Sequence, residues 1–358
     1  MNATRSITMR AASYRQFGPP EVVRIVDIPK PSPRPDEVLI RVHASTLSAA
    51  DRRSRRRSVP RGLQAFAALA LGVFGPRTPV LGMDAAGVVE AVGAEVTAFV
   101  PGDEVVAMLG ARFGGHAEYV TVPQDGAITA KPRNMGFEEA VTLVFGGLTA
   151  HGFLARAAIR TGDTVLINGA SGAVGTAAVQ LAKNLGAYVT AVCSGANRDL
   201  VTSLGADRVI DYATEDFAAG TRTYDVIMDC VGNAPFERVE TCLNPGGALL
   251  LVITDLKGLL RAPGRSRNSG KLVTAGNLRL RYTGEDLAFL VGLAESGRYR
   301  AVIDRSYALS DIVRAHRFVD SGRKRGNVIV RVAGSAPGQS LTKRSSATTE
   351  PGTGAKAP

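Results

Sequence analysis

The stretch from Thr164 to Lys183 reads TVLINGASGAVGTAAVQLAK. It begins with an apolar, β-branched run, Thr164–Asn168, which is typical of a buried strand. A glycine-rich loop, 169–175, comes next, and the residues after it have the apolar spacing of a helix. A glycine loop that joins a strand directly to a helix is typical of the phosphate-binding turn of dinucleotide folds. The stretch therefore predicts an α/β domain built on a parallel sheet.

Two glycines of this loop have separate physical purposes. A Cβ at Gly172 would collide with a bound pyrophosphate, so glycine lets the phosphates approach the backbone. Gly175 allows the helix to pack closely on the sheet. The helix N-terminus then offers unpaired N–H groups and a positive dipole end to the phosphates. Ala170 replaces the first glycine of the usual GxGxxG pattern, and the alternative interpretation is a glycine turn that binds nothing.

The end of the following strand bears on the choice of cofactor. Sites that prefer NAD place an Asp or Glu there, on the ribose hydroxyls. In this chain the strand ends at Cys193 and Ser194, and no carboxylate follows before Asp199. Ser194, Asn197 and Arg198 supply a hydroxyl, an amide and a guanidinium, which suit a 2′-phosphate. The sequence predicts NADPH, although Arg198 could also be an ordinary exposed arginine at a helix start.

Short predicted elements extend on both sides of this stretch. Downstream, apolar strands alternate with helices, which indicates a parallel sheet covered on both faces. Upstream, short strands separated by Pro and Gly indicate a small β-barrel-like domain. The expected downstream elements are strands at 188–193, 208–212, 224–230 and 248–253 and a helix at 197–204; the expected upstream strands are 38–42, 85–92, 104–108 and 119–122.

These elements predict two domains. The β-barrel-like catalytic domain comprises residues 1–132 and is completed by 298–333, where strands at 301–303 and 328–332 flank a helix at 311–320. The dinucleotide-binding domain comprises residues 133–297 and begins with a helical pattern at 137–150. Residues 334–358 are rich in Ser, Thr, Pro, Gly, Ala and Lys, and we expect a disordered tail.

The composition narrows the class of protein. The chain has 358 residues and a net charge of +11, and 45% of its residues are hydrophobic, which excludes an intrinsically disordered chain. Three cysteines and four histidines, all scattered, exclude a disulfide scaffold and a four-cysteine zinc lobe, so we expect no metal and a cytoplasmic location. The basic clusters lack interleaved aromatic residues, so we expect solvated basic loops and no nucleic-acid partner.

One segment allows two interpretations. An arginine cluster that starts at Arg52 leads into LQAFAALALGVF, which ends at Phe74 and has about half the length that spans a bilayer. It could be an interfacial helix on anionic lipid. The interpretation that we favour is a helix covering one end of the catalytic domain. Residues 1–10 contain no apolar core of a signal peptide.

An ordered series of motifs resembles a known family. The chain is similar, from Met9 to Val332, to the zinc-independent quinone-oxidoreductase branch of the medium-chain dehydrogenase/reductases. Within that branch it resembles the subgroup of chloroplast-envelope and mitochondrial NADPH oxidoreductases. The motifs are FGPPEV (17–22), PDEVLIRV (35–42), LGMDAAG (81–87), GDEV (102–105), GGHAEY (114–119), GGLTA (146–150), the glycine loop (169–175), LGADRVIDY (204–212) and NPGG (244–247).

The resemblance implies a fold and a site. A GroES-like β-barrel catalytic domain would join a Rossmann domain with a doubly wound parallel sheet, and the active site would lie in the cleft between them. A homodimer would form near residues 279–282. The resemblance places the pyrophosphate on Ser171, Gly172, Ala173, Val174 and Gly175, the 2′-phosphate near Ser194, Asn197, Arg198 and Tyr212, and the nicotinamide near Thr149. It also places the returning segment 323–326, which includes Arg325, close to the cofactor.

The resemblance also bears on metal and on catalysis. Zinc-dependent relatives carry a Cys near position 48 and a His-Glu pair at 83–84, where this chain has Ser48, Met83 and Asp84. Ser48 is our candidate for a polar contact with the substrate, whereas Asp51 is expected to cap the adjacent turn. The proton-donating tyrosine of enoyl-thioester reductases should lie near residues 50–70, and no Tyr occurs between Tyr14 and Tyr119.

We therefore expect an NADPH-dependent, metal-independent oxidoreductase. Its substrate would be a small molecule, either a quinone or an α,β-unsaturated carbonyl compound, which accepts a hydride without a metal Lewis acid. One alternative is reduction of an enoyl thioester or a biosynthetic intermediate by the same fold, with the arginine cluster attracting an anionic carrier. The other alternative is a sensor or interaction protein that binds NADPH without turnover.

Overall fold

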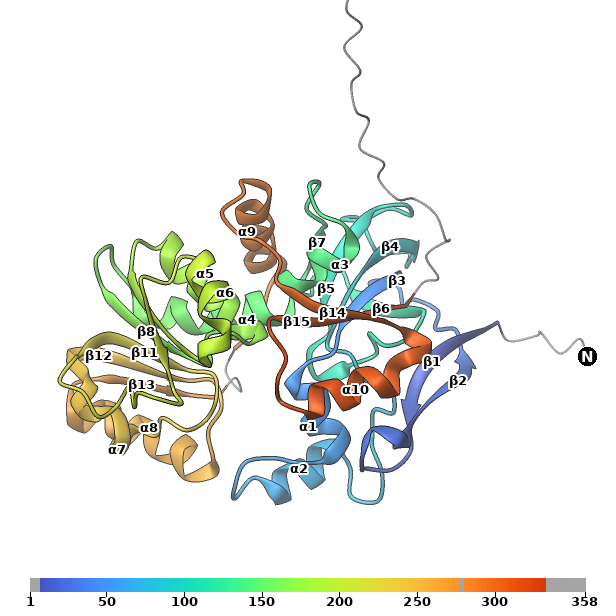
Figure 1. The fold of residues 1–358 in the computed structure, drawn as a ribbon. Coiled ribbons are helices and arrows are strands. Elements are labelled where there is room, and N and C mark those ends of the chain that lie inside the picture. Colours follow the sequence, from blue (N-terminus) through green and yellow to red (C-terminus); the bar gives the residue numbers. More distant parts are fainter. Residues whose placement is uncertain (1–6, 277–279, 333–358) are drawn as a thin grey trace, which may run out of the picture.

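The computed structural model describes residues 7–276 and 280–332 (Figure 1). The predicted tail at 334–358 lies outside the described residues, as does Arg279 of the predicted dimer edge. Two sheets dominate the fold, a parallel one in the middle of the chain and a mixed one built from both ends. Figure 1 shows them side by side, with α9 (Gly284–Glu295) and α4 (Phe145–Leu154) between them. The predicted fold class is confirmed.

The parallel sheet has the strand order β10-β9-β8-β11-β12-β13. Numbered from β8, this is the order 3-2-1-4-5-6 of doubly wound dinucleotide-binding sheets. The winding reverses beside β8, so the loops after β8 and β11 diverge and leave a crevice at the carboxyl ends of the strands. The strands are β8 (Thr164–Asn168), β9 (Tyr188–Cys193), β10 (Arg208–Asp211), β11 (Tyr224–Asp229), β12 (Leu243–Leu251) and β13 (Leu272–Ala275).

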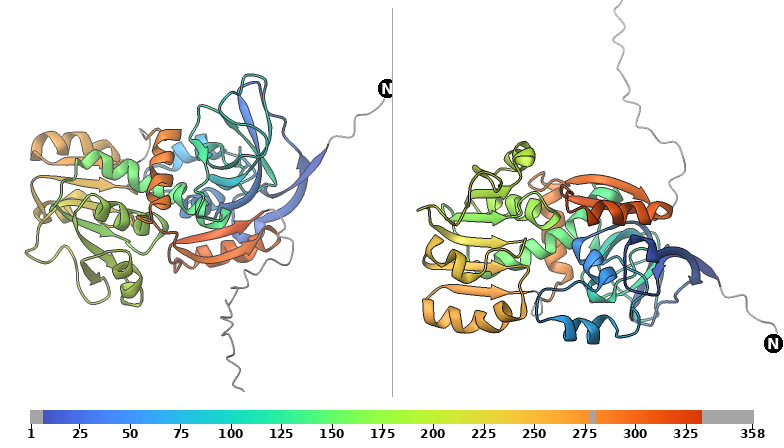
Figure 2. Two further views of the ribbon diagram at one scale, coloured as in Figure 1. Left: turned by 90° about the horizontal axis from the view of Figure 1, so that it is seen from above. Right: turned by 60° about the horizontal axis from the view of Figure 1, so that its bottom comes forward.

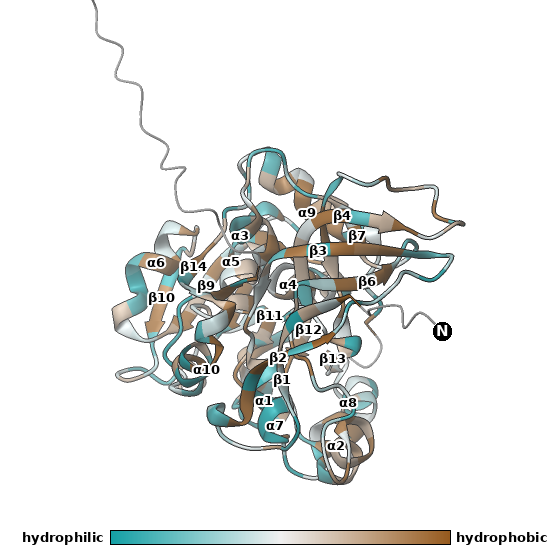
Figure 3. Ribbon diagram, turned by 90° about the vertical axis from the view of Figure 1, so that its right-hand side faces the viewer, coloured by the Kyte–Doolittle hydropathy of each residue, from teal (hydrophilic) through white to brown (hydrophobic). Residues whose placement is uncertain are grey.

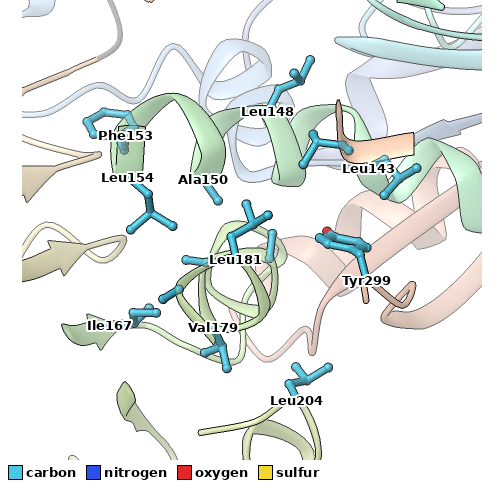
Figure 4. Close-up of a cluster of buried hydrophobic side chains, with 14 of the residues drawn as sticks. Leu143, Leu148, Ala150, Phe153, Leu154, Ile167, Val179, Leu181, Leu204 and Tyr299 are labelled. Atoms are coloured by element: carbon cyan, nitrogen blue, oxygen red, sulfur yellow. The ribbon is translucent and has the colours of Figure 1, made fainter. Parts of the chain in front are cut away.

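Helices cover both faces of this sheet (Figure 2). α4 packs against α5 (Ala173–Asn184), and Figure 4 shows the apolar side chains that meet there, among them Ala150 and Leu181. The predicted helix at 137–150 is divided into α3 (Phe137–Ala140), a 3₁₀ turn (Val141–Leu143) and α4. The other helices are α6 (Arg198–Ser203), α7 (Phe236–Val239), α8 (Leu256–Ser269), α9 and 3₁₀ turns at Ala155–Ala157, Gly195–Asn197 and Glu240–Cys242.

One helical run, Phe137–Ala157, is long and apolar enough to cross a membrane by length and composition. In this structure 67% of its apolar window is buried. Phe153 and Leu154 belong to the same core as Val179 of α5. The apolar residues of this run therefore pack in the interior of the protein.

The mixed sheet has the order β14-β15-β3-β4-β5-β7, and β6 also pairs with β3. β15 pairs antiparallel with β3, so the end of the described chain returns to the sheet of the first third. Its strands are β3 (Glu37–Thr46), β4 (Asp84–Val92), β5 (Glu104–Met108), β6 (Tyr119–Pro123), β7 (Ile128–Ala130), β14 (Ile303–Ala308) and β15 (Asn327–Arg331). A separate two-stranded sheet consists of β1 (Thr8–Tyr14) and β2 (Val23–Pro29). The helices of this part are α1 (Ala49–Arg56), α2 (Gln64–Leu71) and α10 (Ile312–Asp320), with 3₁₀ turns at Pro20–Val22, Gly110–Arg112 and Leu309–Asp311.

A buried polar cluster joins α1 to α10. The guanidinium of Arg55 is fully buried and donates to both carboxylate oxygens of Asp320, at 2.6 and 2.7 Å. His316 is also fully buried, and neither of its ring nitrogens has a partner within the described residues. Burial lowers the pKa of His316 well below its usual 6.5, and the neighbouring His116 and Arg55 lower it further.

We predict that His316 makes stability depend on pH. As the pH falls below about 6.5, the unfolded chain protonates this imidazole and the folded protein does not, so the free energy of unfolding falls, by at most about 1.4 kcal/mol per pH unit. Burial raises the pKa of Asp84 to about 7, which acts in the opposite direction. Asp84 contributes equally to the parent protein and to His316→Leu, so the difference between their pH profiles reports on His316.

The measurement is chemical denaturation at several pH values from about 7.5 to about 5.5, an interval that includes the ordinary histidine pKa of about 6.5. The parent protein should lose more stability over this interval than His316→Leu. Parallel pH profiles for the two proteins would show that His316 is protonated alike in the folded and unfolded states.

Candidate active site

The loop after β8 has the backbone that its glycines predict. Gly169 has a φ of +79°, in the left-handed region that favours glycine. A Cβ on Gly175 would lie 2.1 Å from the carbonyl oxygen of Gly169. Only glycine allows α5 to start this close to the end of β8. Gly175 is therefore required by the packing of the helix on the loop, as expected from the sequence.

Gly172 is different, because the protein itself does not require a glycine there. The nearest atom to a Cβ built on Gly172 is the Gly169 carbonyl oxygen, at 3.5 Å, which is ordinary contact. Gly172 is the N-cap of α5 and supplies no side-chain acceptor for the first-turn N–H groups. Open space thus lies beside unpaired amides at a helix N-terminus, which is how proteins hold phosphate groups. The loop fits a dinucleotide pyrophosphate.

The residues assigned to the adenosine end meet at the carboxyl ends of β8, β9 and β10. The side-chain amide of Asn197 donates to Ser171 Oγ at 3.0 Å. The backbone N–H of Tyr212 donates to the carbonyl oxygen of Cys193 at 3.2 Å, so Tyr212 is next to Ser194. Arg198 begins α6 and is exposed. Ser171, Asn197 and Tyr212, which follow three different strands, thus lie at the same edge of the sheet, whereas the Arg198 guanidinium donates to the Val209 carbonyl oxygen at 3.4 Å.

A carboxylate that sequence reasoning missed lies at this edge. Asp211 ends β10 and pairs with Cys193 of β9. A Cβ on Gly195 would lie 2.4 Å from Asp211 Oδ2, and Asp211 Oδ1 accepts from the N–H of Ala213 at 3.0 Å. Asp211 is 18 residues after Cys193 in the chain, and only the parallel register brings the two together. A carboxylate is therefore present near the end of β9, and the neighbouring strand β10 supplies it.

The returning segment touches the phosphate loop directly. The N–H of Gly326 donates to the carbonyl oxygen of Ser171 at 2.8 Å, and Gly326 forms a parallel bridge with Gly172. The N–H of Arg325 donates to Asp304 Oδ2 at 2.6 Å, and its side chain is exposed. Lys324, in the same predicted segment, donates from Nζ to the Gly326 carbonyl oxygen at 2.8 Å. Burial lowers the pKa of Lys324 to about 8.

α4 meets the same loop from the other side. A Cβ on Gly146 would lie 2.8 Å from the carbonyl oxygen of Ala173, so α4 and the start of α5 are in close contact. Thr149, one turn further along α4, is buried. The ring of Tyr282 lies against α4, since a Cβ on Gly152 would lie 3.3 Å from Tyr282 Cε1, and burial raises the pKa of this tyrosine. Tyr282 was also missed, because nothing in the linear sequence connects it to α4.

A pocket lies at the carboxyl ends of β11 and β12. It has a volume of about 360 Å³ and is lined from the parallel-sheet side by Val231, Gly232 and Ile253, and from the other side by Pro60 and Arg61. A second pocket, of about 440 Å³, shares Arg61 with the first and continues towards α8. The crevice expected from the sheet topology is therefore hollow, and residues that follow α1 form its far wall.

Comparisons with known proteins agree with this geometry. Residues 34–133 match the alcohol dehydrogenase GroES-like domain, and residues 204–330 match a model described as zinc-binding dehydrogenase. Over 339 residues the chain is 33% identical to quinone-oxidoreductase QR1 of Triphysaria versicolor, a match that covers 90% of this chain and 98% of that protein. The chain belongs to the medium-chain dehydrogenase/reductase family.

Two further relatives extend the comparison within this family. The chain is 30% identical to the NADPH-dependent alkenal/one oxidoreductase of Arabidopsis thaliana, covering 90% of this chain and 79% of that protein. The structure of the quinone oxidoreductase from Coxiella burnetii matches with a TM-score of 0.81 and 32% identity, covering 91% of this chain and all of that one. The protein is an oxidoreductase that uses a nicotinamide cofactor.

Ser48 stands where zinc-dependent medium-chain relatives carry a ligand, and here it caps α1. Its hydroxyl donates to Asp51 Oδ2 at 2.6 Å and accepts from the N–H groups of Ala50 and Asp51. Asp51 also accepts from the N–H of Gly82 at 2.9 Å, so this carboxylate is a structural residue of the turn. The geometry gives Ser48 a capping role, and a contact with substrate would require these hydrogen bonds to open.

Asp84, which follows Met83 in the pair at 83–84, is fully buried. Its carboxylate accepts from the N–H and from the hydroxyl of Thr46, both at 2.6 Å, and from Ser45 Oγ at 3.1 Å. These bonds hold β4 beside β3. Within residues 7–276 and 280–332 no three His, Cys, Asp or Glu side chains form a group that could hold a metal ion.

Proposed function

We propose that this protein reduces a quinone or an α,β-unsaturated carbonyl compound with NADPH and without a metal. The observation that carries the proposal is the open space at Gly172 beside a pocket at the carboxyl ends of the strands. NADPH, when bound, supplies a hydride from its nicotinamide ring. Relatives named quinone oxidoreductase and alkenal/one oxidoreductase support this class of acceptor.

The residues of this chain would bind and orient the two reactants. The first-turn amides of α5 would hold the pyrophosphate, and Ser194, Asn197 and Arg198 would hold the 2′-phosphate. The apolar side chains of Val231, Leu251 and Ile253 would exclude water from the acceptor and align it. The buried hydroxyl of Tyr282 and the solvent are the available sources of the proton that follows the hydride.

We propose a metal-free mechanism because of the side chains that this chain has at the family's zinc positions. Ser48 is engaged in capping α1, Met83 has only a weak thioether acceptor, and Asp84 is committed to Thr46 and Ser45. Quinones and enones accept a hydride without a Lewis acid. Turnover should therefore be unchanged after dialysis against a strong chelator, and loss of turnover that zinc restores would overturn this part of the proposal.

Arg198→Ala tests the preference for NADPH. We expect the KM for NADPH to rise about 10- to 100-fold, because a charge-assisted contact with the 2′-phosphate contributes about 1.5–3 kcal/mol. The KM for NADH should stay unchanged, since NADH has no such phosphate. Arg24→Ala, an exposed arginine on β2, serves as the matched control. Equal effects on both cofactors would assign Arg198 a structural role, and Asp211 would then favour NADH.

A panel of acceptors tests the substrate class. NADPH oxidation, followed by the absorbance of the reduced nicotinamide, should be fast with quinones and free enones and slow with enoyl-CoA thioesters. A preference for the thioesters would replace the proposal with the enoyl-reductase alternative. Binding of NADPH without oxidation by any acceptor would indicate a sensor.

A further inference from the structure

An exposed apolar surface lies at one end of the molecule. Phe66 and Leu69 of α2 are 67% and 64% exposed, Phe74 after the helix is fully exposed, and Leu260 of α8 is 70% exposed. Figures 1 and 2 place α2 and α8 on the same side of the molecule. Figure 3 shows the hydrophobic colour of α2 beside α8. We call these four residues, together with Val73, the apolar end surface.

The helix at the centre of this surface lacks the burial that its sequence requires. α2 reads QAFAALAL and contains no charged residue, yet Ala67 is its one buried residue. A helix that is apolar all round is normally buried, and a helix under about 12 residues is marginal in water without packing. The interpretation that α2 covers the end of the catalytic domain therefore does not account for Phe66, Leu69 and Phe74, whose side chains are mostly exposed among the described residues.

Positive charge surrounds this apolar surface. Between Asp51 and Asp84 the chain has seven arginines and no acid, and α8 has four basic residues and no acid. Some of these are paired, as Arg55 is with Asp320 and Arg265 with Glu237. Arg61, Arg77 and Lys257 are exposed and form no ion pair within the described residues. The end surface thus combines protruding apolar side chains with unpaired cations.

Exposed apolar side chains beside unpaired cations favour one kind of binding partner over the others. A second copy of the chain, docked through a two-fold axis, would place Arg61 and Lys257 of each copy near the same cations of the other, which is repulsive. A free anionic metabolite would use the cations but leave Phe66 and Phe74 in water. A bilayer that contains anionic lipid accommodates both features, since aromatic side chains enter the interface and basic side chains reach the headgroups.

We propose that α2, the turn after it and α8 form a docking surface for anionic lipid bilayers. The docked protein would present its pocket to the membrane, because Arg61, Leu260 and Lys257 line the 440 Å³ pocket that opens beside the apolar end surface. Resting on the proposed function, this orientation means that the acceptor is a lipophilic quinone or enone taken up from the bilayer.

Vesicle flotation with the full chain tests the docking surface. The parent protein should bind vesicles of phosphatidylcholine mixed with phosphatidylglycerol at least about 10-fold more strongly than vesicles of phosphatidylcholine alone, and raised salt should weaken binding. Phe66→Gln/Phe74→Gln should lower the partition coefficient at least about 10-fold. Phe289→Gln, a matched exposed phenylalanine of α9 (49% exposed), should bind as the parent does.

Three results would overturn the docking surface. These are no binding to the anionic vesicles, equal binding by Phe66→Gln/Phe74→Gln, and self-association of the parent that this variant abolishes in place of vesicle binding. NADPH oxidation with a water-soluble quinone is measured on the same samples and should be unchanged in the double variant, whose altered residues do not line the pockets. Vesicle binding without turnover would support the docking surface and contradict the proposed function.

Discussion

Gly172→Val lowers the affinity for NADPH at least about 100-fold, equivalent to about 2.7 kcal/mol, and leaves the protein folded. The space beside Gly172 is free in this structure, with 3.5 Å between a new Cβ and the nearest atom, so a Cβ fits there without a shift of the backbone. Once there, its methyl groups occupy the volume in front of the first-turn amides of α5, where the pyrophosphate is expected. Isothermal titration calorimetry gives the affinity, and thermal unfolding reports the fold.

Gly175→Ala is the matched control, three residues further along the same loop. Its Cβ would lie 2.1 Å from the Gly169 carbonyl oxygen, so the backbone must shift and the melting temperature should fall. The two variants thus distinguish an effect on NADPH binding from an effect on folding stability. If Gly172→Val bound NADPH with the affinity of the parent, the cofactor would have to lie elsewhere.

Asp320→Ala lowers the free energy of unfolding by about 3–5 kcal/mol, because it leaves a buried cation without its partner. Arg55 is fully buried, and its two hydrogen bonds within the described residues end on the Asp320 carboxylate. The nearby Arg52 and Arg56 add positive charge around this carboxylate. Chemical denaturation of the two proteins measures the difference.

Two variants make this result specific. Asp311→Ala removes the partner of Arg314 in an exposed pair just before α10 and should cost under about 1 kcal/mol. Arg55→Met/Asp320→Leu replaces the whole pair by apolar side chains and should recover much of the lost stability. If Asp320→Ala and Asp311→Ala destabilised the protein equally, Arg55 would be solvated in solution and the buried pair would contribute little.

The phosphate loop could be predicted from sequence because its determinants are local. A strand, a glycine turn and a helix within 20 residues fix one another, and β8 has the predicted bounds. The residues around Asn197 were predictable for the same reason, since they follow the next strand. Asp211 and Tyr282 could not be found in this way. Register and tertiary contacts place them, and no spacing in the chain encodes those contacts.

Two helices show where local patterns mislead. α8 includes Pro263 and Gly264, which are usually helix breakers, and it was not predicted. It begins at the N-cap Asp255, whose carboxylate accepts from the N–H of Gly258 at 2.7 Å. α2 was predicted as a helix, but its burial was not predictable. The spacing of apolar residues in a sequence is the same for a helix that packs in a protein core and for one that lies on a membrane.

Transfer of deuterium to the acceptor from NADPH labelled at both C4 positions of the nicotinamide ring is the decisive measurement. The protein is incubated with an enone in the presence of a strong chelator, and the product is examined by mass spectrometry. We predict one deuterium on the β-carbon of the reduced enone for each NADPH consumed, at a rate that the chelator does not change. Reduced product without deuterium, or no product from bound NADPH, would contradict direct, metal-free hydride transfer.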